Sequence, residues 1–213
     1  MIHVYGVVDG LEELPPLAGV DDAPLERRRV DGLEVVVSLA RTPPSAEVTR
    51  EAVLRHAQVV EGLLARSRAV LPAQLGRAFR DEDELAGALR AQATQLGRGL
   101  DRVRGCVEFG LRVLPVDTGP HLDASSGAEY MRTRLEELRG QDRLVAELHE
   151  PLARLAREST LQRDDGGIRA AYLVERRNAA SFREAAESLE RATELAAVCT
   201  GPWPPYSFAE GDS

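Results

Sequence analysis

Gly201-Pro202-Trp203-Pro204-Pro205-Tyr206-Ser207-Phe208 is the stretch of sequence that decides how the second half of the chain folds. It holds three of the nine aromatic residues of the chain, including the only Trp, which sets it apart from an ordinary polar tail. Each proline fixes its own φ and pushes the residue before it toward extended geometry. We therefore expect a stiff, extended segment that lies against the fold as the closing strand of the chain.

Four side chains of this closing segment are our candidate partner-binding residues: Trp203, Pro205, Tyr206 and Phe208. Aromatic side chains supply large apolar area, and Trp and Tyr add a polar tip. A strand at the edge of a sheet, beside exposed aromatics, can accept a strand or a helix of a partner. Closing the fold and docking a partner are therefore compatible roles for the segment.

The chain from Cys106 onward predicts a regular order of elements before this segment. Apolar and polar residues alternate at its start, which is the pattern of a strand. Pro151 should kink or split the helix that follows, because proline cannot donate a backbone hydrogen bond. The expected elements are a strand over 106–114, a helix over 130–157, a hairpin of strands over 160–163 and 168–175, a helix ending at Cys199, and the closing segment. This β-α-β-β-α-β order is that of a ferredoxin-like unit.

The first half of the chain predicts a related but different order. Asp31-Gly32 is a strong two-residue hairpin turn, and it joins strands over 25–30 and 33–39. A β-branched strand over 2–8 precedes the hairpin. Ser45 is the expected N-cap of the next helix. The later elements are that helix to about Ser67, a strand over 71–79, and one helix from Asp81 to Val103 in which Glu84 completes a capping box.

Helical spacing assigns an apolar face to two of these helices. In the helix after Ser45 the inward positions are Ala52, Val53, His56, Val59, Val60 and Leu63. In the helix over 130–157 they are Met131, Leu135, Leu138, Val145, Leu152 and Leu155. The fold class is therefore α+β, with two small layered domains: residues 1–104, and a ferredoxin-like domain over 105–213.

Composition restricts the possible functions. The chain has 213 residues, 43% of them apolar and 29% charged, which is ordinary for a globular protein. The net charge of −8 argues against a nucleic-acid partner. No apolar run approaches the ~20 residues of a membrane span. The start of the chain lacks the features of a signal peptide, and two cysteines make no disulfide framework, so a cytoplasmic location is expected.

Few residues are candidates for catalysis or ligand binding, and a structural explanation accounts for each. His56 lies on an apolar helix face, with no carboxylate or nucleophile at helical spacing, so we expect a core or interface histidine. Cys106 and Cys199 are expected to be buried thiols. The Arg27-Arg28-Arg29 run is expected at a solvated sheet edge that discourages strand pairing. We predict no catalytic residues, no cofactor and no metal site.

The sequence resembles the gas vesicle protein GvpL/GvpF family along nearly its whole length. The stretches that carry the resemblance appear in family order: Val4-Tyr5-Gly6-Val7-Val8, Val35-Val36-Val37-Ser38, residues 55–61 (RHAQVVE), residues 71–76 (LPAQLG), Val107-Glu108, Tyr172-Leu173-Val174-Glu175 and the closing segment. The family usually has a basic residue and Phe after Leu-Pro-Val, where this chain has Gln74 and Leu75. Arg77 could supply the basic side chain instead.

The resemblance implies a non-enzymatic gas vesicle protein. It would be a minor structural or assembly component that acts with the small hydrophobic shell protein and with other gas vesicle accessory proteins. The alternative is an enzyme or small-ligand module with a ferredoxin-like cleft. That alternative predicts a concave pocket with converging polar groups.

Overall fold

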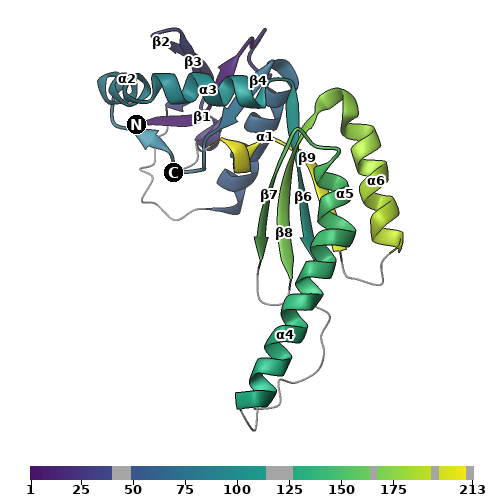
Figure 1. Ribbon diagram of the computed structural model, residues 1–213. Helices are drawn as coiled ribbons and strands as arrows, with labels where there is room; N and C mark the ends of the chain where they lie inside the picture. Colours follow the sequence, from purple (N-terminus) through teal and green to yellow (C-terminus); the bar gives the residue numbers. More distant parts are fainter. Residues whose placement is uncertain (40–48, 114–126, 164–166, 193–196, 210–213) are drawn as a thin grey trace. The chain divides into compact units, whose positions relative to one another are not determined.

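A computed structural model describes residues 1–39, 49–113, 127–163, 167–192 and 197–209. The chain forms two compact units (Figure 1). The first comprises Met1–Cys106 and the residues from Trp203 onward, and the second comprises Val107–Pro202. Each unit combines helices with its own sheet, which confirms the α+β class. We expected everything after residue 104 in the second domain, whereas the chain from Trp203 onward groups with the first unit.

The first unit is built on one sheet with the strand order β2-β3-β1-β4, and β5 also pairs with β1. Its elements are β1 (Ile2–Asp9), the 3₁₀ turn η1 (Val20–Asp22), β2 (Leu25–Val30), β3 (Leu33–Leu39), α1 (Arg50–Arg66), β4 (Ala69–Pro72), β5 (Ala78–Phe79), α2 (Glu82–Ala91) and α3 (Ala93–Val103). The predicted hairpin is confirmed. Asp31 and Gly32 both have positive φ, at 48° and 83°, as a type I′ turn requires.

Strand β1 is the centre of this sheet, and its residues from Ile2 to Val8 are all buried. Because successive side chains of a strand point to opposite faces, both faces of β1 must be covered. On one face His3 contacts His56 of α1. On the other face, Leu71 of β4, the strand that pairs with β1, packs against α3. The contact is close at Gly99 of α3, where an added Cβ would lie 3.0 Å from the Leu71 side chain. Figure 1 shows α2 and α3 running across the sheet.

Helix α1 starts later than we predicted. Thr49 caps it by accepting the N–H of Ala52 at 3.1 Å, and Ser45 lies outside the described residues. His56, Val59, Val60 and Leu63 are buried as predicted. The prediction for Val53 is wrong, since this side chain is exposed. The helical period alone could not show that the sheet covers α1 only from His56 onward.

Two further predictions for the first unit need correction. The predicted strand over 71–79 is two strands, β4 and β5, because the chain turns between them at Gly76, where φ is +91°. The predicted single helix is two helices, because Gln92 leaves helical geometry at φ −112° and ψ 9°. Asp81 caps α2 as expected by accepting the N–H of Glu84. The Glu84 carboxylate, however, accepts the N–H of Arg80, so the capping box is only half formed.

The second unit is ferredoxin-like, as predicted. Its elements are β6 (Cys106–Val113), α4 (Gly127–Leu144), the π-helical turn η2 (Val145–His149), α5 (Glu150–Ala153), β7 (Glu158–Arg163), β8 (Ile168–Glu175), the 3₁₀ turn η3 (Arg176–Asn178), α6 (Ala179–Ala192) and β9 (Ala197–Trp203). The strand order is β7-β8-β6-β9. Counted within the unit this is 2-3-1-4, the order that a β-α-β-β-α-β chain adopts in a ferredoxin-like sheet.

An aromatic cluster forms the core of the second unit. Phe109 of β6 and Tyr172 of β8 both pack against Phe182 of α6, with ring centroids 4.8 and 5.3 Å apart. The Tyr172 hydroxyl lies 3.0 Å from Nδ1 of His149, so the buried phenol has a polar partner. Strand β6 therefore meets β8 and α6, which come much later in the chain, through rings on one face of the sheet.

The predicted helix over 130–157 is interrupted and ends earlier, at Ala153. A π-helical turn precedes Pro151, whose ring cannot fit a regular α-helical turn. The buried ridge consists of Leu144, Leu148 and Leu152. Of our predicted inward positions Leu152 is correct, whereas Met131, Leu135, Leu138 and Leu155 are exposed.

The last helix also ends earlier than we expected. Helix α6 stops at Ala192, and Cys199 lies in the middle of β9, not at the end of a helix. The closing strand is nevertheless present, and it pairs beside β6. It extends from Ala197 only as far as Trp203. The closing segment is therefore a strand only at its start, and the residues from Pro204 onward are not part of the sheet.

The two buried histidines of the first unit are held neutral. Nε2 of His56 lies 2.9 Å from the carbonyl oxygen of Ala73 and must donate to it, because a carbonyl only accepts. Nδ1 of His56 therefore accepts from Nε2–H of His3 at 3.0 Å. Burial, and then repulsion by His56, lower the pKa of His3 to about 4. Burial also lowers the pKa of His56.

We predict that stability falls on acidification below about pH 6.5. There the unfolded chain binds protons that the folded His3 and His56 exclude, so unfolding becomes more favourable. The contribution of His3 is complete above its unfolded pKa of about 6.5. It is lost progressively toward pH 4, and amounts to about 3 kcal/mol. Urea unfolding at pH 7, 6 and 5 measures this loss.

The control is His3→Gln, which keeps an N–H donor toward Nδ1 of His56 but does not titrate. Its free energy of unfolding should change less between pH 6.5 and 5 than that of the wild type. Equal pH slopes in the two proteins would contradict the assignment.

Candidate functional site

The closing segment divides into a buried part and an exposed part. After β9, Pro204 and Pro205 are buried, and the 3₁₀ turn η4 (Tyr206–Phe208) buries Phe208. The Arg102 guanidinium of α3 lies 5.6 Å from the centre of the Phe208 ring. The segment thus ends as an anchor in the first unit, and this anchor, not a continued strand, is its second half.

Gly201 is required where the closing segment passes β6. Its φ of +127° is a conformation that other residues rarely adopt. A Cβ at this position would lie 2.7 Å from the carbonyl oxygen of Glu108 and 3.0 Å from the Phe109 ring. Both the backbone conformation and the close approach therefore exclude a side chain.

Two side chains of α6 hold backbone groups of β9. The Glu190 carboxylate accepts the N–H of Cys199 at 2.5 Å. The Arg183 guanidinium donates to the carbonyl oxygen of Gly201 at 2.8 Å. Backbone groups that are already paired are unavailable to an incoming strand. The geometry therefore favours contact with a partner through side chains over strand addition at this part of β9.

The four candidate partner-binding residues do not share one environment. Pro205 and Phe208 are buried, so they hold the segment in place. Trp203 and Tyr206 are 44% and 38% exposed and remain accessible. Burial of its hydroxyl group, together with the Glu61 carboxylate, raises the pKa of Tyr206 to about 12, so Tyr206 is a neutral donor at neutral pH. The accessible candidates are therefore Trp203 and Tyr206.

The thiols do not form a reactive site. Cys106 is buried and Cys199 half-buried, and the two do not form a disulfide. Burial, followed by the nearby Glu190 carboxylate, raises the pKa of Cys199 to about 11. Only the thiolate is a good nucleophile, so Cys199 is unreactive near pH 7.

The arginine run lies where the sequence predicted it. Strand β2 is at the edge of the first sheet. Arg27 and Arg29 pair with Glu34, and Arg28 pairs with Glu82 of α2 at 2.8 Å. These charges discourage a further strand from pairing with β2.

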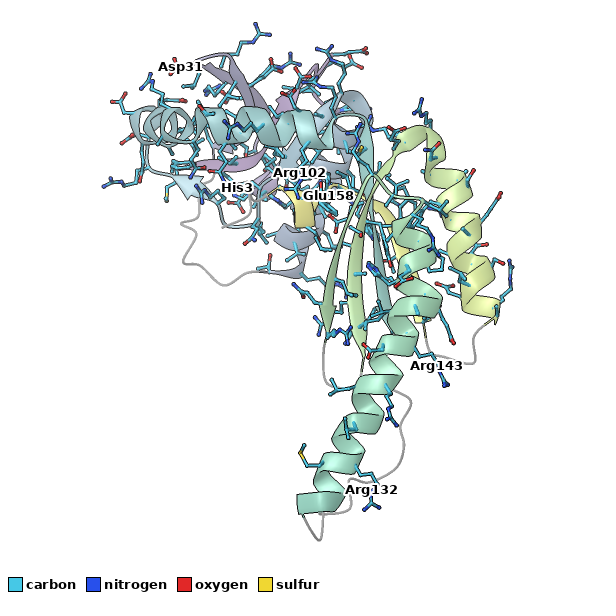
Figure 2. The ribbon with its side chains drawn as sticks, viewed as in Figure 1. His3, Asp31, Arg102, Arg132, Arg143 and Glu158 are labelled. Atoms are coloured by element: carbon cyan, nitrogen blue, oxygen red, sulfur yellow. The ribbon has the colours of Figure 1, made fainter. Side chains whose placement is uncertain are left out.

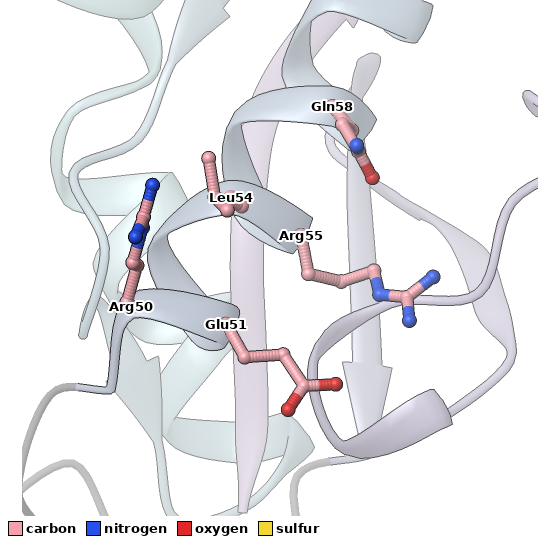
Figure 3. Close-up of a pocket in the computed structure, with 5 residues that line it drawn as sticks. All are labelled: Arg50, Glu51, Leu54, Arg55 and Gln58. Carbon is pink, nitrogen blue, oxygen red and sulfur yellow. The ribbon is translucent and has the colours of Figure 1, made fainter.

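A surface hollow on α1 is lined by Arg50, Glu51, Leu54, Arg55 and Gln58. All five belong to a single helix, and Figure 3 shows Arg50 and Leu54 pointing away from Glu51 and Arg55. Arg55 is engaged with Asp22 of η1 at 3.2 Å. The hollow therefore lacks the converging polar groups that a small-ligand site needs.

The described part of the chain has neither a metal-binding cluster nor a membrane-spanning helix. Within it, no three metal-ligating side chains come together. Among the helices of that part, none is both long and apolar enough to cross a bilayer.

The position where the family pattern has a basic residue is polar and exposed in this chain. Gln74 lies just after β4, and Arg77 lies three residues further on. The Arg77 guanidinium sits 5.5 Å from the centre of the Phe79 ring. A basic side chain thus lies next to an aromatic ring, three residues after Gln74.

Fold and surface together define an α+β protein of two units, the second ferredoxin-like, that exposes the aromatic side chains of Trp203 and Tyr206. The family model for gas vesicle synthesis protein GvpL/GvpF matches residues 1–210. The chain belongs to this family.

Individual relatives agree with the family match. Gas vesicle protein F2 of Halobacterium salinarum is 30% identical over 217 residues, which cover 98% of this chain and 92% of that protein. Gas vesicle protein L of a Streptomyces species is 28% identical over 222 residues, covering 91% and 77%. Both F and L proteins are thus among the relatives.

Solved structures show the same fold. The crystal structure of GvpF from Anabaena sp. PCC7120 has a TM-score of 0.85 at 19% identity, covering all of this chain and 97% of that one. GvpF from Microcystis aeruginosa has a TM-score of 0.75 at 18% identity, covering 98% of both chains.

We predict that Gly201→Ala is strongly destabilising. The added Cβ disfavours the positive φ of this residue and clashes with the carbonyl oxygen of Glu108. Together these effects should lower the free energy of unfolding by about 2 kcal/mol or more. Gly140→Ala is the matched control in the same unit, because Gly140 lies in α4 with open space around it. Alanine there should be neutral or stabilising by up to about 1 kcal/mol. Equal unfolding midpoints for the two variants would contradict the role of Gly201.

We predict that Phe208→Ala destabilises the first unit. Removing a buried phenyl ring costs about 3–5 kcal/mol. Hydrogen exchange should show lost protection in β1, β4 and α3, with the second unit less affected. Trp203→Ala, at an exposed neighbour, should change stability by less than about 1 kcal/mol. Loss of protection confined to β6 and β9 would show that the segment instead supports the second unit.

Proposed function

We propose that this chain is a non-enzymatic assembly component of gas vesicles that acts with the small hydrophobic shell protein and with other accessory proteins of the vesicle. Membership of the GvpL/GvpF family, whose description is gas vesicle synthesis protein, supports this proposal. The proposal adds a physical role, which is to hold an aggregation-prone apolar subunit before or during its incorporation. In that role the protein acts at the growing vesicle, in the cytoplasm.

The single observation that carries the proposal is the exposure of Trp203 and Tyr206 on a rigid support. Exposed apolar side chains are common, but an aromatic pair in a segment anchored by buried Phe208 is a prepared contact surface. Little conformational entropy is lost when a partner binds, because the prolines and the anchor have already fixed the backbone.

The small-ligand or enzymatic alternative has less support. The hollow on α1 is open and its side chains diverge. The relatives carry gas vesicle names and none that denotes an enzyme. A small molecule that stays bound through purification would support the small-ligand or enzymatic alternative.

Co-expression of tagged protein with the shell protein, followed by affinity purification, tests the proposal. The wild type should retain shell protein, and the double variant W203A/Y206A should retain about tenfold less, because aromatic residues dominate interface energies. Leu17→Ala is the control, since Leu17 is an exposed apolar residue of the same unit outside the closing segment. It should retain the wild-type amount.

Two results would count against the proposal. If the wild type retains neither shell protein nor any other gas vesicle protein, the function is wrong. If W203A/Y206A retains the full amount, the function stands but the surface lies elsewhere.

A further inference from the structure

Helix α4 carries an exposed apolar stripe that the ferredoxin-like core does not use. Met131, Leu135 and Leu138 are 58%, 50% and 39% exposed. Their spacing of four and three residues places them within about 60° of one another around the helix. Figure 1 shows the N-terminal part of α4 extending beyond the ends of β7 and β8 of its own sheet. The stripe therefore lies on a helix that stands clear of that sheet.

The stripe is not a continuation of the buried ridge. Leu144, the first residue of that ridge, lies about 150° around the helix from the middle of the stripe. Four residues before Leu144, one turn toward the N-terminus, lies Gly140, which is exposed and has no side chain to continue the ridge. The apolar residues of α4 thus change sides, which packing against the β-sheet does not explain.

Arginines border the stripe. With Leu135 at position a of a heptad and Met131 and Leu138 at d, Arg132 and Arg139 both occupy e, next to the apolar seam. Both are exposed, and with Arg143 they form a row within about 40° on one flank. Figure 2 shows Arg132 and Arg143 on the same side of α4. Among the described side chains, neither Arg132 nor Arg139 has an acidic partner, while Arg143 lies 4.0 Å from Glu147.

This charge pattern disfavours a second copy of the chain as the partner. An antiparallel pair of α4 helices would face e against e, which brings Arg132 toward Arg139 of the other copy. A parallel pair would face e against g, and Arg134 occupies g by its place in the sequence. Either arrangement opposes like charges beside the seam.

We propose that the stripe on α4 is a docking site for an amphipathic helix of a partner protein, with apolar residues at a and d and acidic residues at e and g. The apolar seam supplies the buried area, and the arginines select the acidic flank. This site is separate from Trp203 and Tyr206. It goes beyond the proposed function, and its test does not use the shell protein.

Two labelled helical peptides test the proposal by fluorescence anisotropy with the full-length protein. Both have Leu at every a and d, one has Glu at every e and g, and the other has Lys. Like charges prevent each peptide from pairing with itself. The Glu peptide should bind about tenfold tighter than the Lys peptide. The double variant R132E/R139E should reverse that preference, and L135E/L138E should lose binding to both.

The matched control is Leu155→Glu, which alters an exposed leucine of the same unit outside the stripe. It should bind the Glu peptide like the wild type, and circular dichroism should show all variants folded. Equal binding of the two peptides by the wild type, or an unchanged preference in R132E/R139E, would overturn the proposal.

Other occupants of the stripe give different results. A wild-type dimer that L135E/L138E abolishes in sedimentation would identify a second copy. Binding to vesicles of phosphatidylcholine and phosphatidylglycerol, lost in the same variant and without peptide binding, would identify a lipid surface. Either result would replace the helix proposal. The shell-protein purification with W203A/Y206A is read independently, so failure of one proposal leaves the other intact.

Discussion

Burial of β1 on both faces is the constraint on which the first unit depends. A strand covered from both sides cannot present alternate polar residues to water, so its polar side chains must find partners inside. His3 does so through His56, and the Tyr5 hydroxyl does so by accepting the N–H of Val20 and contacting Ser38. These contacts attach α1 and η1 to the same strand. The first unit is therefore held together by a few buried hydrogen bonds as well as by apolar packing.

The second unit obtains its stability in another way. Its core is a cluster of rings, in which the Tyr172 hydroxyl contacts His149. Gly201 allows the last strand to approach β6 closely, and Glu190 and Arg183 secure that strand from α6. Because α6 already holds backbone groups of β9, the surfaces that we propose for partners are side chains at the end of β9 and along α4. Recognition by apolar and charged side chains suits a protein whose hollow on α1 is open and lacks converging polar groups.

Local signals in the sequence predicted the elements that depend on local chemistry. The Asp31-Gly32 turn, the alternation in β6 and the strand order of the second unit all follow from short patterns that the structure confirms. Errors arose where a neighbour in space decides the outcome. Periodicity marked Val53 and Leu138 as apolar, but only the extent of the sheet determines that they are exposed. The reversal of the apolar face near Leu144 is readable from the helical phase, and it is the signal that our sequence analysis missed. The split between anchored Phe208 and exposed Tyr206 was not readable, since it depends on contacts with α3, about a hundred residues earlier in the chain.

The grouping of Trp203 and its successors with the first unit has a consequence for the order of synthesis. The second unit is an insertion between two parts of the first, so its residues all emerge from the ribosome before the first unit is complete. Domains tend to fold as units while the chain is being made. The N-terminal sheet therefore lacks the Phe208 anchor until the second unit and the closing segment have been made. A protein of this topology gains this core contact only after its second unit has been made, and a chain that stops before Phe208 leaves the first-made unit unfinished.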